Sequence, residues 1–135
     1  MATTKLMSDE ELSPEAKAVF DDIRATRGSD FINNVWRALA WDPPLLKRTW
    51  DHAKEVMASP GVLDPLTREM IYVAVSIANS CEYCVHSHTA FARAKGMTDK
   101  QYAELIEIVT LASSTNALAT ALQVPVDPEF RAEPD

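Results

Sequence analysis

Residues 64–88 read DPLTREMIYVAVSIANSCEYCVHSH and contain the strongest signals for the fold. Asp64 before Pro65 is a capping residue followed by a first-turn proline, a pair that typically opens a helix. After Glu69 the segment is apolar on almost every side, so we expect a helix to about Asn79 that lies at the centre of the fold. A short break then precedes a second helix, which starts at the two cysteines.

Signals of the same kind predict helices on both sides of this pair. We expect the second helix to run from residue 81 or 82 to 95, with Gly96 as its left-handed C-terminal residue. A capping box of Thr98 and Gln101 opens a last long helix to about residue 122, whose second half is rich in small side chains. Capping residues and prolines delimit earlier helices over about 13–27, 32–41 and 43–59. With three glycines and no regular alternation of apolar and polar residues, the sequence predicts an all-helical, compact multi-helix bundle.

Length and charge narrow the class of protein. A chain of 135 residues has the usual size of a single domain, so we expect one domain over residues 1–135. The net charge is −7 and no cluster of Lys and Arg is present, which argues against a nucleic-acid partner. The longest apolar stretch, residues 70–78, is shorter than the roughly 20 residues that span a bilayer. Residues 1–11 do not resemble a secretory signal, so we expect a cytoplasmic protein without a membrane partner. The acidic tail, residues 127–135, is expected to be loosely held.

The segment Cys81-Glu82-Tyr83-Cys84 carries the chemistry. Cysteines three apart on a helix lie on adjacent turns of one face, close enough to form a disulfide or to share a ligand. At the first turn of a helix, free N–H groups and the positive end of the dipole stabilise a thiolate and lower its pKa below the free value of about 8.5. In a reducing compartment such a pair is more often catalytic, redox-active or metal-binding than structural. We therefore expect a reactive sulfur.

A histidine and a glutamate are the candidate proton carriers. His88 follows Cys84 by four residues, hence on the same helix face and one turn on, where an imidazole can exchange a proton with the sulfur. Glu69 precedes the apolar run, where partial burial would raise the pKa of its carboxyl group and make it a proton acceptor. Pairing of Glu69 with His88 requires the two helices to pack antiparallel across the turn at Ser80. His86 points elsewhere on the helix and is expected to lie on the surface.

These residues resemble the alkylhydroperoxidase D-like group of the carboxymuconolactone decarboxylase-like superfamily, in its peroxidase-related branch. The pattern of that group is Glu, eleven residues, Cys, two residues, Cys, three residues, His, and Glu69, Cys81, Cys84 and His88 match every spacing. The resemblance covers about residues 65–111. In the best-known members a histidine also stands between the cysteines, and here that position is Tyr83. True lactone decarboxylases of the superfamily usually lack the cysteine pair, which argues against decarboxylation.

The resemblance implies an all-helical fold, assembly into trimers or hexamers, and a peroxidase cycle. Cys84 would be the peroxidatic thiolate that attacks hydrogen peroxide or an organic hydroperoxide, and Cys81 would resolve its sulfenic acid to a disulfide. Glu69 and His88 would relay protons. An external dithiol, such as a dihydrolipoyl-type carrier, would restore both thiols. No cofactor and no metal are expected.

Three other interpretations of the same residues stay open. The cysteines could serve a thiol-disulfide oxidoreductase or redox sensor that has no preference for peroxide, or they could be buried structural residues. Cys81, Cys84 and His88, with Glu69 or His86, could also supply four ligands to zinc in a binding or oligomerisation module. Structural zinc sites usually carry a second Cys/His pair distant in sequence, which is missing here. Covalent haem needs His directly after the second Cys, and Val85 excludes it.

Overall fold

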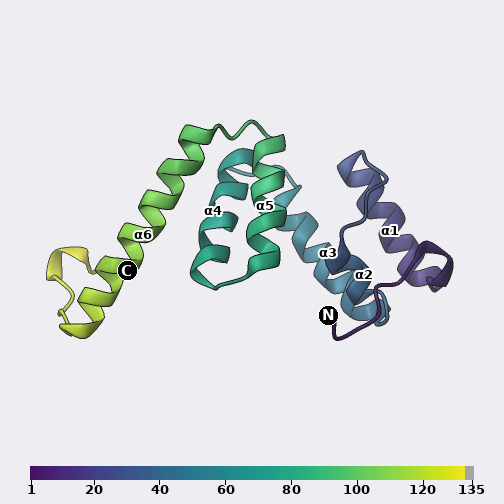
Figure 1. Cartoon of the computed structure of the whole chain (residues 1–135), viewed down its shortest axis with the longest axis horizontal. Coiled ribbons are helices and arrows are strands. Elements are labelled where there is room, and N and C mark those ends of the chain that lie inside the picture. Colours follow the sequence, from purple (N-terminus) through teal and green to yellow (C-terminus); the bar gives the residue numbers. More distant parts are fainter. Residues whose placement is uncertain (133–135) are drawn as a thin grey trace. The chain divides into compact units, whose positions relative to one another are not determined.

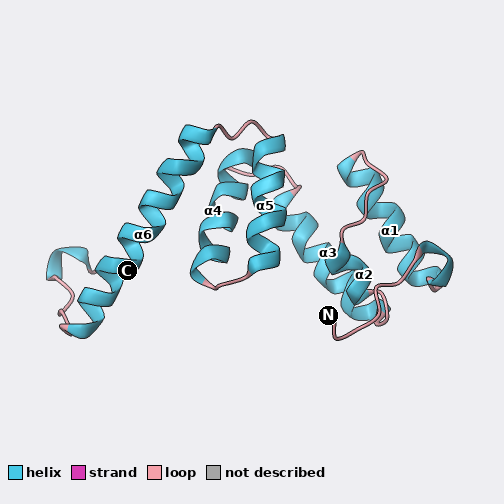
Figure 2. Ribbon diagram, in the orientation of Figure 1, coloured by secondary structure: helices cyan, strands magenta, loops and turns pink. Residues whose placement is uncertain are grey.

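The computed structural model describes residues 1–132, and its regular secondary structure there consists of helices joined by loops and turns (Figures 1 and 2). Within that range no strand occurs, as the sequence predicts. The elements are η1 (Asp9–Glu11), α1 (Pro14–Arg27), α2 (Asn34–Leu39), α3 (Pro43–Met57), α4 (Pro65–Ala78), α5 (Glu82–Ala94), α6 (Asp99–Ala121) and η2 (Pro128–Phe130). The contacts divide the chain into two compact units, Met1–Val62 and a second that starts at Leu63. The expectation of one domain over residues 1–135 stays a prediction.

The first unit packs α1 and α2 against α3 around a core of nine buried apolar residues. Phe20 and Leu46 are fully buried there, and the rings of Trp36 and Trp50 meet edge to face with centroids 5.5 Å apart. The indole N–H of Trp50 donates to Asp22, 2.7 Å away, so its polar end is satisfied inside the core. The first unit therefore has a hydrophobic core of its own.

The second unit is built on a hairpin of α4 and α5, which lie side by side in Figure 1. The helices follow each other after a three-residue turn, and Ser80 in that turn adopts a positive φ of 56°, a conformation that permits the abrupt reversal of the chain. Asp64 caps α4 by accepting the N–H of Thr67, and α6 also contacts α4. The buried apolar side chains among its described residues are Val73, Ala92, Met97 and Leu105.

The expectation that the apolar helix 64–79 lies at the centre of the fold is wrong for the single chain. Ile71, Tyr72 and Val75 of α4 are between 41 and 52% exposed. In α6, every residue from 110 to 121 is exposed, including Leu111 and Leu118. The reason is that α4 packs mainly against α5 and, less extensively, against α6, and these two helices leave part of its surface uncovered. The second unit therefore presents much of its apolar surface to the outside.

Helix ends agree with the sequence signals where capping chemistry is local. Thr98 and Gln101 form the expected capping box, and Gly28 and Gly96 both have positive φ. The helix expected over 32–41 is shorter, because α3 starts at Pro43 and Asn33 before α2 is extended. No helix of residues 1–132 is long and apolar enough to cross a membrane, and the cytoplasmic location stays a prediction. Of the acidic tail, residues 127–132 are exposed, and residues 133–135 lie outside the described residues.

Candidate active site

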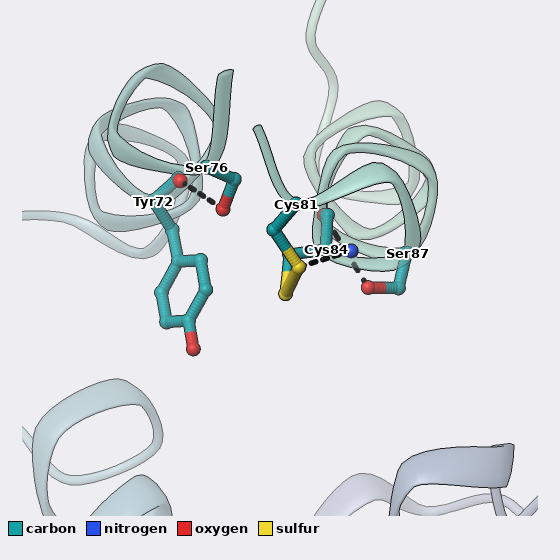
Figure 3. The surroundings of a disulfide bond; sticks show 5 residues. All are labelled: Tyr72, Ser76, Cys81, Cys84 and Ser87. Carbon is teal, nitrogen blue, oxygen red and sulfur yellow. Dashed lines mark hydrogen bonds between the residues drawn. A yellow bond between two sulfur atoms is a disulfide. The ribbon is translucent and has the colours of Figure 1, made fainter. Parts of the chain in front are cut away.

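The two cysteines lie at the start of α5 and are joined by a disulfide (Figure 3). Cys81 is the capping residue of the helix and Cys84 lies one turn in, with their Cα atoms 5.3 Å apart. The backbone N–H of Cys84 donates to Sγ of Cys81 at 3.3 Å. Both sulfurs therefore lie at the positive end of the helix dipole, where negative charge on sulfur is favoured. Both cysteines are half-buried, which excludes a pair sealed in the core.

The chain around the disulfide is fixed by backbone and hydroxyl hydrogen bonds. The N–H of Cys81 donates to the carbonyl oxygen of Ser76, 3.0 Å away, which ties the start of α5 to the end of α4. Figure 3 shows the Ser76 hydroxyl directed into the space between the helices, where it donates to the carbonyl of Tyr72. Ser87 donates to the carbonyl of Cys84 at 3.4 Å. These contacts hold the reactive segment on two helices rather than on a loose loop.

Glu69 and His88 meet across the hairpin, as the antiparallel arrangement requires. His88 Nδ1 lies 2.7 Å from Glu69 Oε2, and Glu69 is 5% exposed. Because an ionised carboxylate can only accept, Nδ1 carries the proton and Nε2 is the ring nitrogen left for proton exchange. The ring is held from two further sides: Tyr72 stacks on it with centroids 3.6 Å apart, and Phe91 meets it edge-on at 5.6 Å. The imidazole thus has a fixed orientation one turn from Cys84.

The expected rise in the pKa of Glu69 is wrong. Burial does raise the pKa of this carboxyl group, but the hydrogen bond with His88 and the positive charge of Lys95 together lower it by more. Lys95 Nζ lies 3.2 Å from Glu69 Oε1, so each carboxylate oxygen has its own partner. The net pKa lies below the usual glutamate value, and Glu69 is an ionised acceptor rather than a poised acid.

Lys95 is the site residue that the sequence interpretation missed, although a signal for it exists. It follows His88 by seven residues, two helical turns along the same face, so any partner of His88 on the facing helix is within its reach. The ring of Tyr72 is part of the site through its stack on His88. His86 is exposed, as expected. In residues 1–132 no group of three or more His, Cys, Asp or Glu side chains is arranged to hold a metal ion.

Comparison with known proteins shows the family of the chain. Residues 43–127 match the model of the carboxymuconolactone decarboxylase family. The crystal structure of the alkylhydroperoxidase AhpD core from Rhodospirillum rubrum is 67% identical and superimposes with a TM-score of 0.96, over 98% of this chain and 99% of that one. At this identity, the similarity in sequence and the similarity in fold indicate the same family.

Three curated relatives carry the name alkyl hydroperoxide reductase AhpD, among them proteins from Maricaulis maris and Solibacter usitatus. The protein from Maricaulis maris is 30% identical over 129 residues, 90% of this chain and 68% of its own length. The protein from Solibacter usitatus is 35% identical over 74 residues, 55% of this chain and 40% of its own length. The chain thus spans less than half of the second relative. These matches and the helical fold agree, and the chain belongs to the carboxymuconolactone decarboxylase family, in its AhpD-like group.

Proposed function

We propose that this protein is a thiol peroxidase that reduces hydrogen peroxide or organic hydroperoxides through a Cys81/Cys84 dithiol-disulfide cycle. The observation that carries the proposal is the disulfide at the start of α5, one turn before a histidine whose orientation is fixed by a buried carboxylate. The names of the AhpD relatives support the same reaction class.

The first step is attack of the Cys84 thiolate on one oxygen of the peroxide. The sulfur–oxygen bond forms as the O–O bond breaks, so the sulfur is oxidised to a sulfenic acid and the peroxide is reduced to an alcohol, or to water from hydrogen peroxide. Cys84 is the better candidate because His88 lies four residues after it on the same helix face. The helix N-terminus favours its thiolate before attack.

His88 and Glu69 carry the protons of this step. His88 Nε2 takes the thiol proton of Cys84 and then delivers it to the departing alkoxide oxygen, so no free alkoxide is released. Glu69 stays ionised and accepts the Nδ1 proton of His88 in a hydrogen bond. In this role the carboxylate sets the tautomer of the imidazole and stabilises its positive charge while it holds the extra proton.

The second half of the cycle restores the thiols. The Cys81 sulfur attacks the sulfenic sulfur of Cys84, water leaves, and the disulfide forms. An external dithiol then reduces that disulfide by two exchange steps and is itself oxidised to a disulfide. The sum is one hydroperoxide and one dithiol converted to one alcohol, one water and one disulfide. A dihydrolipoyl-type carrier is the donor that the family resemblance implies.

The apolar surface of the second unit supports assembly with further copies of this chain, as trimers or hexamers. Large apolar side chains are exposed on α4 and on the second half of α6, among them Ile71, Leu111 and Leu118. Large exposed apolar patches mark interaction sites, and an interface over α4 and α6 would cover these side chains. The small side chains of α6 between residues 112 and 121 would permit close approach of a helix from another copy.

The test is peroxide turnover with dihydrolipoamide as donor, for the wild type and a set of variants. Cys84→Ser is expected to abolish turnover, and His88→Asn to lower it strongly. His86→Asn is the matched control, because this histidine lies two residues from Cys84 but is exposed. Full turnover by Cys84→Ser would refute the proposal, and so would equal losses at the two histidines.

The same disulfide also favours a second candidate, a thiol-disulfide oxidoreductase or redox sensor. Comparison of the rate with peroxide and the rate with a small disulfide substrate separates the two, since a peroxidase has a much higher kcat/KM for the peroxide. Metal analysis of the reduced protein tests the zinc-binding alternative: near-stoichiometric zinc would favour a binding module.

A further inference from the structure

The carboxylate of Glu69 has two partners, and the proposed proton relay uses one of them. Oε2 faces Nδ1 of His88 and Oε1 faces Nζ of Lys95, at 2.7 and 3.2 Å. A carboxylate that is 5% exposed loses most of its hydration and stays charged where hydrogen-bonding cations replace the lost water. The ammonium group of Lys95 thus helps to keep the buried carboxylate of Glu69 ionised.

The position of Lys95 is built into α5. It is the C-terminal capping residue of the helix, where positive charge is favoured by the helix dipole. Phe91 lies between it and His88 along the same face, and its ring contacts both: the Nζ atom is 5.7 Å from the ring centroid and the imidazole is edge-on to it. The lysine side chain is 37% exposed, so the ammonium group reaches the carboxylate from the solvent side.

We propose that Lys95 is a positioning residue of the active site, which acts through Glu69: its ammonium group anchors Oε1 so that Oε2 is held as a charged acceptor for Nδ1 of His88. This inference rests on the proposed peroxidase function for its catalytic consequence, but the anchoring itself does not depend on the substrate. Lys95 is expected to touch neither the peroxide nor the sulfurs.

The charges around Glu69 agree with this role. Burial raises the pKa of Glu69, whereas His88 and Lys95 lower it, and the net pKa lies below the usual value. Without the lysine, burial would be opposed by His88 alone, and the carboxyl group would take up a proton at a higher pH. Of the charged or titratable side chains on the three helices, His88 and Lys95 contact the Glu69 carboxylate. Others on these helices interact elsewhere: Arg68 and Tyr72 on α4, Arg93 on α5, and Asp99 and Tyr102 on α6.

The experiment replaces Lys95 by Met, which keeps the length of the side chain and removes the charge. Lys95→Arg restores the charge, Lys95→Gln is a second neutral variant, and Lys100→Met on α6 is the control at an exposed lysine. Two readouts are taken on the full chain: the titration of the Glu69 carboxyl group by 13C NMR of the disulfide form, and the pH profile of peroxide turnover.

Loss of the charge is expected to raise the midpoint of the Glu69 titration by about one pH unit, a tenfold change in proton affinity. The acidic limb of turnover is expected to move to higher pH in Lys95→Met and Lys95→Gln but not in Lys95→Arg or Lys100→Met. A lysine that merely packs would leave both midpoints in place, and that result would overturn the inference. A shifted titration in a protein that consumes no peroxide would support the anchoring and refute the proposed function.

Discussion

Glu69→Gln removes one charge from the site and leaves its shape almost unchanged. The carboxylate accepts from His88 through one oxygen and from Lys95 through the other. An amide has one oxygen and one NH₂ group, so it can satisfy one of these donors and must turn its own donor toward the other. The variant therefore loses at least one charge-assisted hydrogen bond in a buried place.

The expected loss of turnover follows from the free energy of the hydrogen bond between Glu69 and His88. A hydrogen bond to a charged group contributes about 1.5–3 kcal/mol. If the hydrogen bond stabilises the protonated imidazole by this whole free energy, its loss lowers kcat/KM for a hydroperoxide by about 10- to 150-fold. The unpaired buried donor lowers the free energy of unfolding by about 1–3 kcal/mol as well.

The assay is dithiol-dependent reduction of an organic hydroperoxide at pH 7, where the unmodified carboxyl group is ionised. Glu82→Gln is the matched control, because Glu82 is an exposed acid on the first turn of α5, beside Cys81. Circular dichroism and thiol counts establish that each variant is folded and carries both cysteines. A loss of less than twofold in Glu69→Gln, with Cys84→Ser inactive, would refute the relay.

Three further outcomes are expected. Because the folded-state pKa of Glu69 is lowered, the stabilisation from its ionised form is present above the unfolded value of about 4.3 and is lost as the pH falls through the folded value. In urea unfolding, the wild type should therefore lose more free energy of unfolding than Glu69→Gln as the pH falls below about 4.3. Tyr72→Phe should keep near-normal turnover and Tyr72→Leu should lose about two- to tenfold, since a ring stack on His88 contributes about 0.5–1.5 kcal/mol; equal activities of the two would contradict the stacking role. Leu118→Glu should reduce the molar mass measured by light scattering, and a mass unchanged from the wild type would remove α6 from the interface.

Local chemistry explains what the sequence predicts well. Capping signals such as Asp64–Pro65 and Thr98 act within one turn, so helix starts follow from the residues alone. The spacing of Cys81 and Cys84 likewise puts both on one helical turn whatever the rest of the fold does. Pairing of Glu69 with His88 was open to prediction because the turn between their helices is so short that an antiparallel hairpin results.

Effects that need several elements at once were not predictable. The sign of the Glu69 pKa shift depends on the balance of burial against the effects of His88 and Lys95. The spacing of His88 and Lys95 indicates that the lysine can reach Glu69 but not which of these effects is larger. The exposure of Ile71 depends on which part of the surface of α4 the other helices of the chain leave uncovered. The hydropathy of a sequence indicates that a helix face is apolar, but it does not indicate whether residues of the same chain cover that face.

In the proposed cycle, peroxide oxidises Cys84 and Cys81 then closes the disulfide. The most direct measurement is mass spectrometry of reduced Cys81→Ser after one equivalent of hydroperoxide, with a sulfenic-acid trapping reagent present. We expect one trapped adduct on Cys84 in this variant, and in the wild type we expect loss of two hydrogens in the peptide that holds both cysteines. A variant that consumes the peroxide without an adduct on Cys84, or a wild type whose two thiols stay reduced, would contradict it.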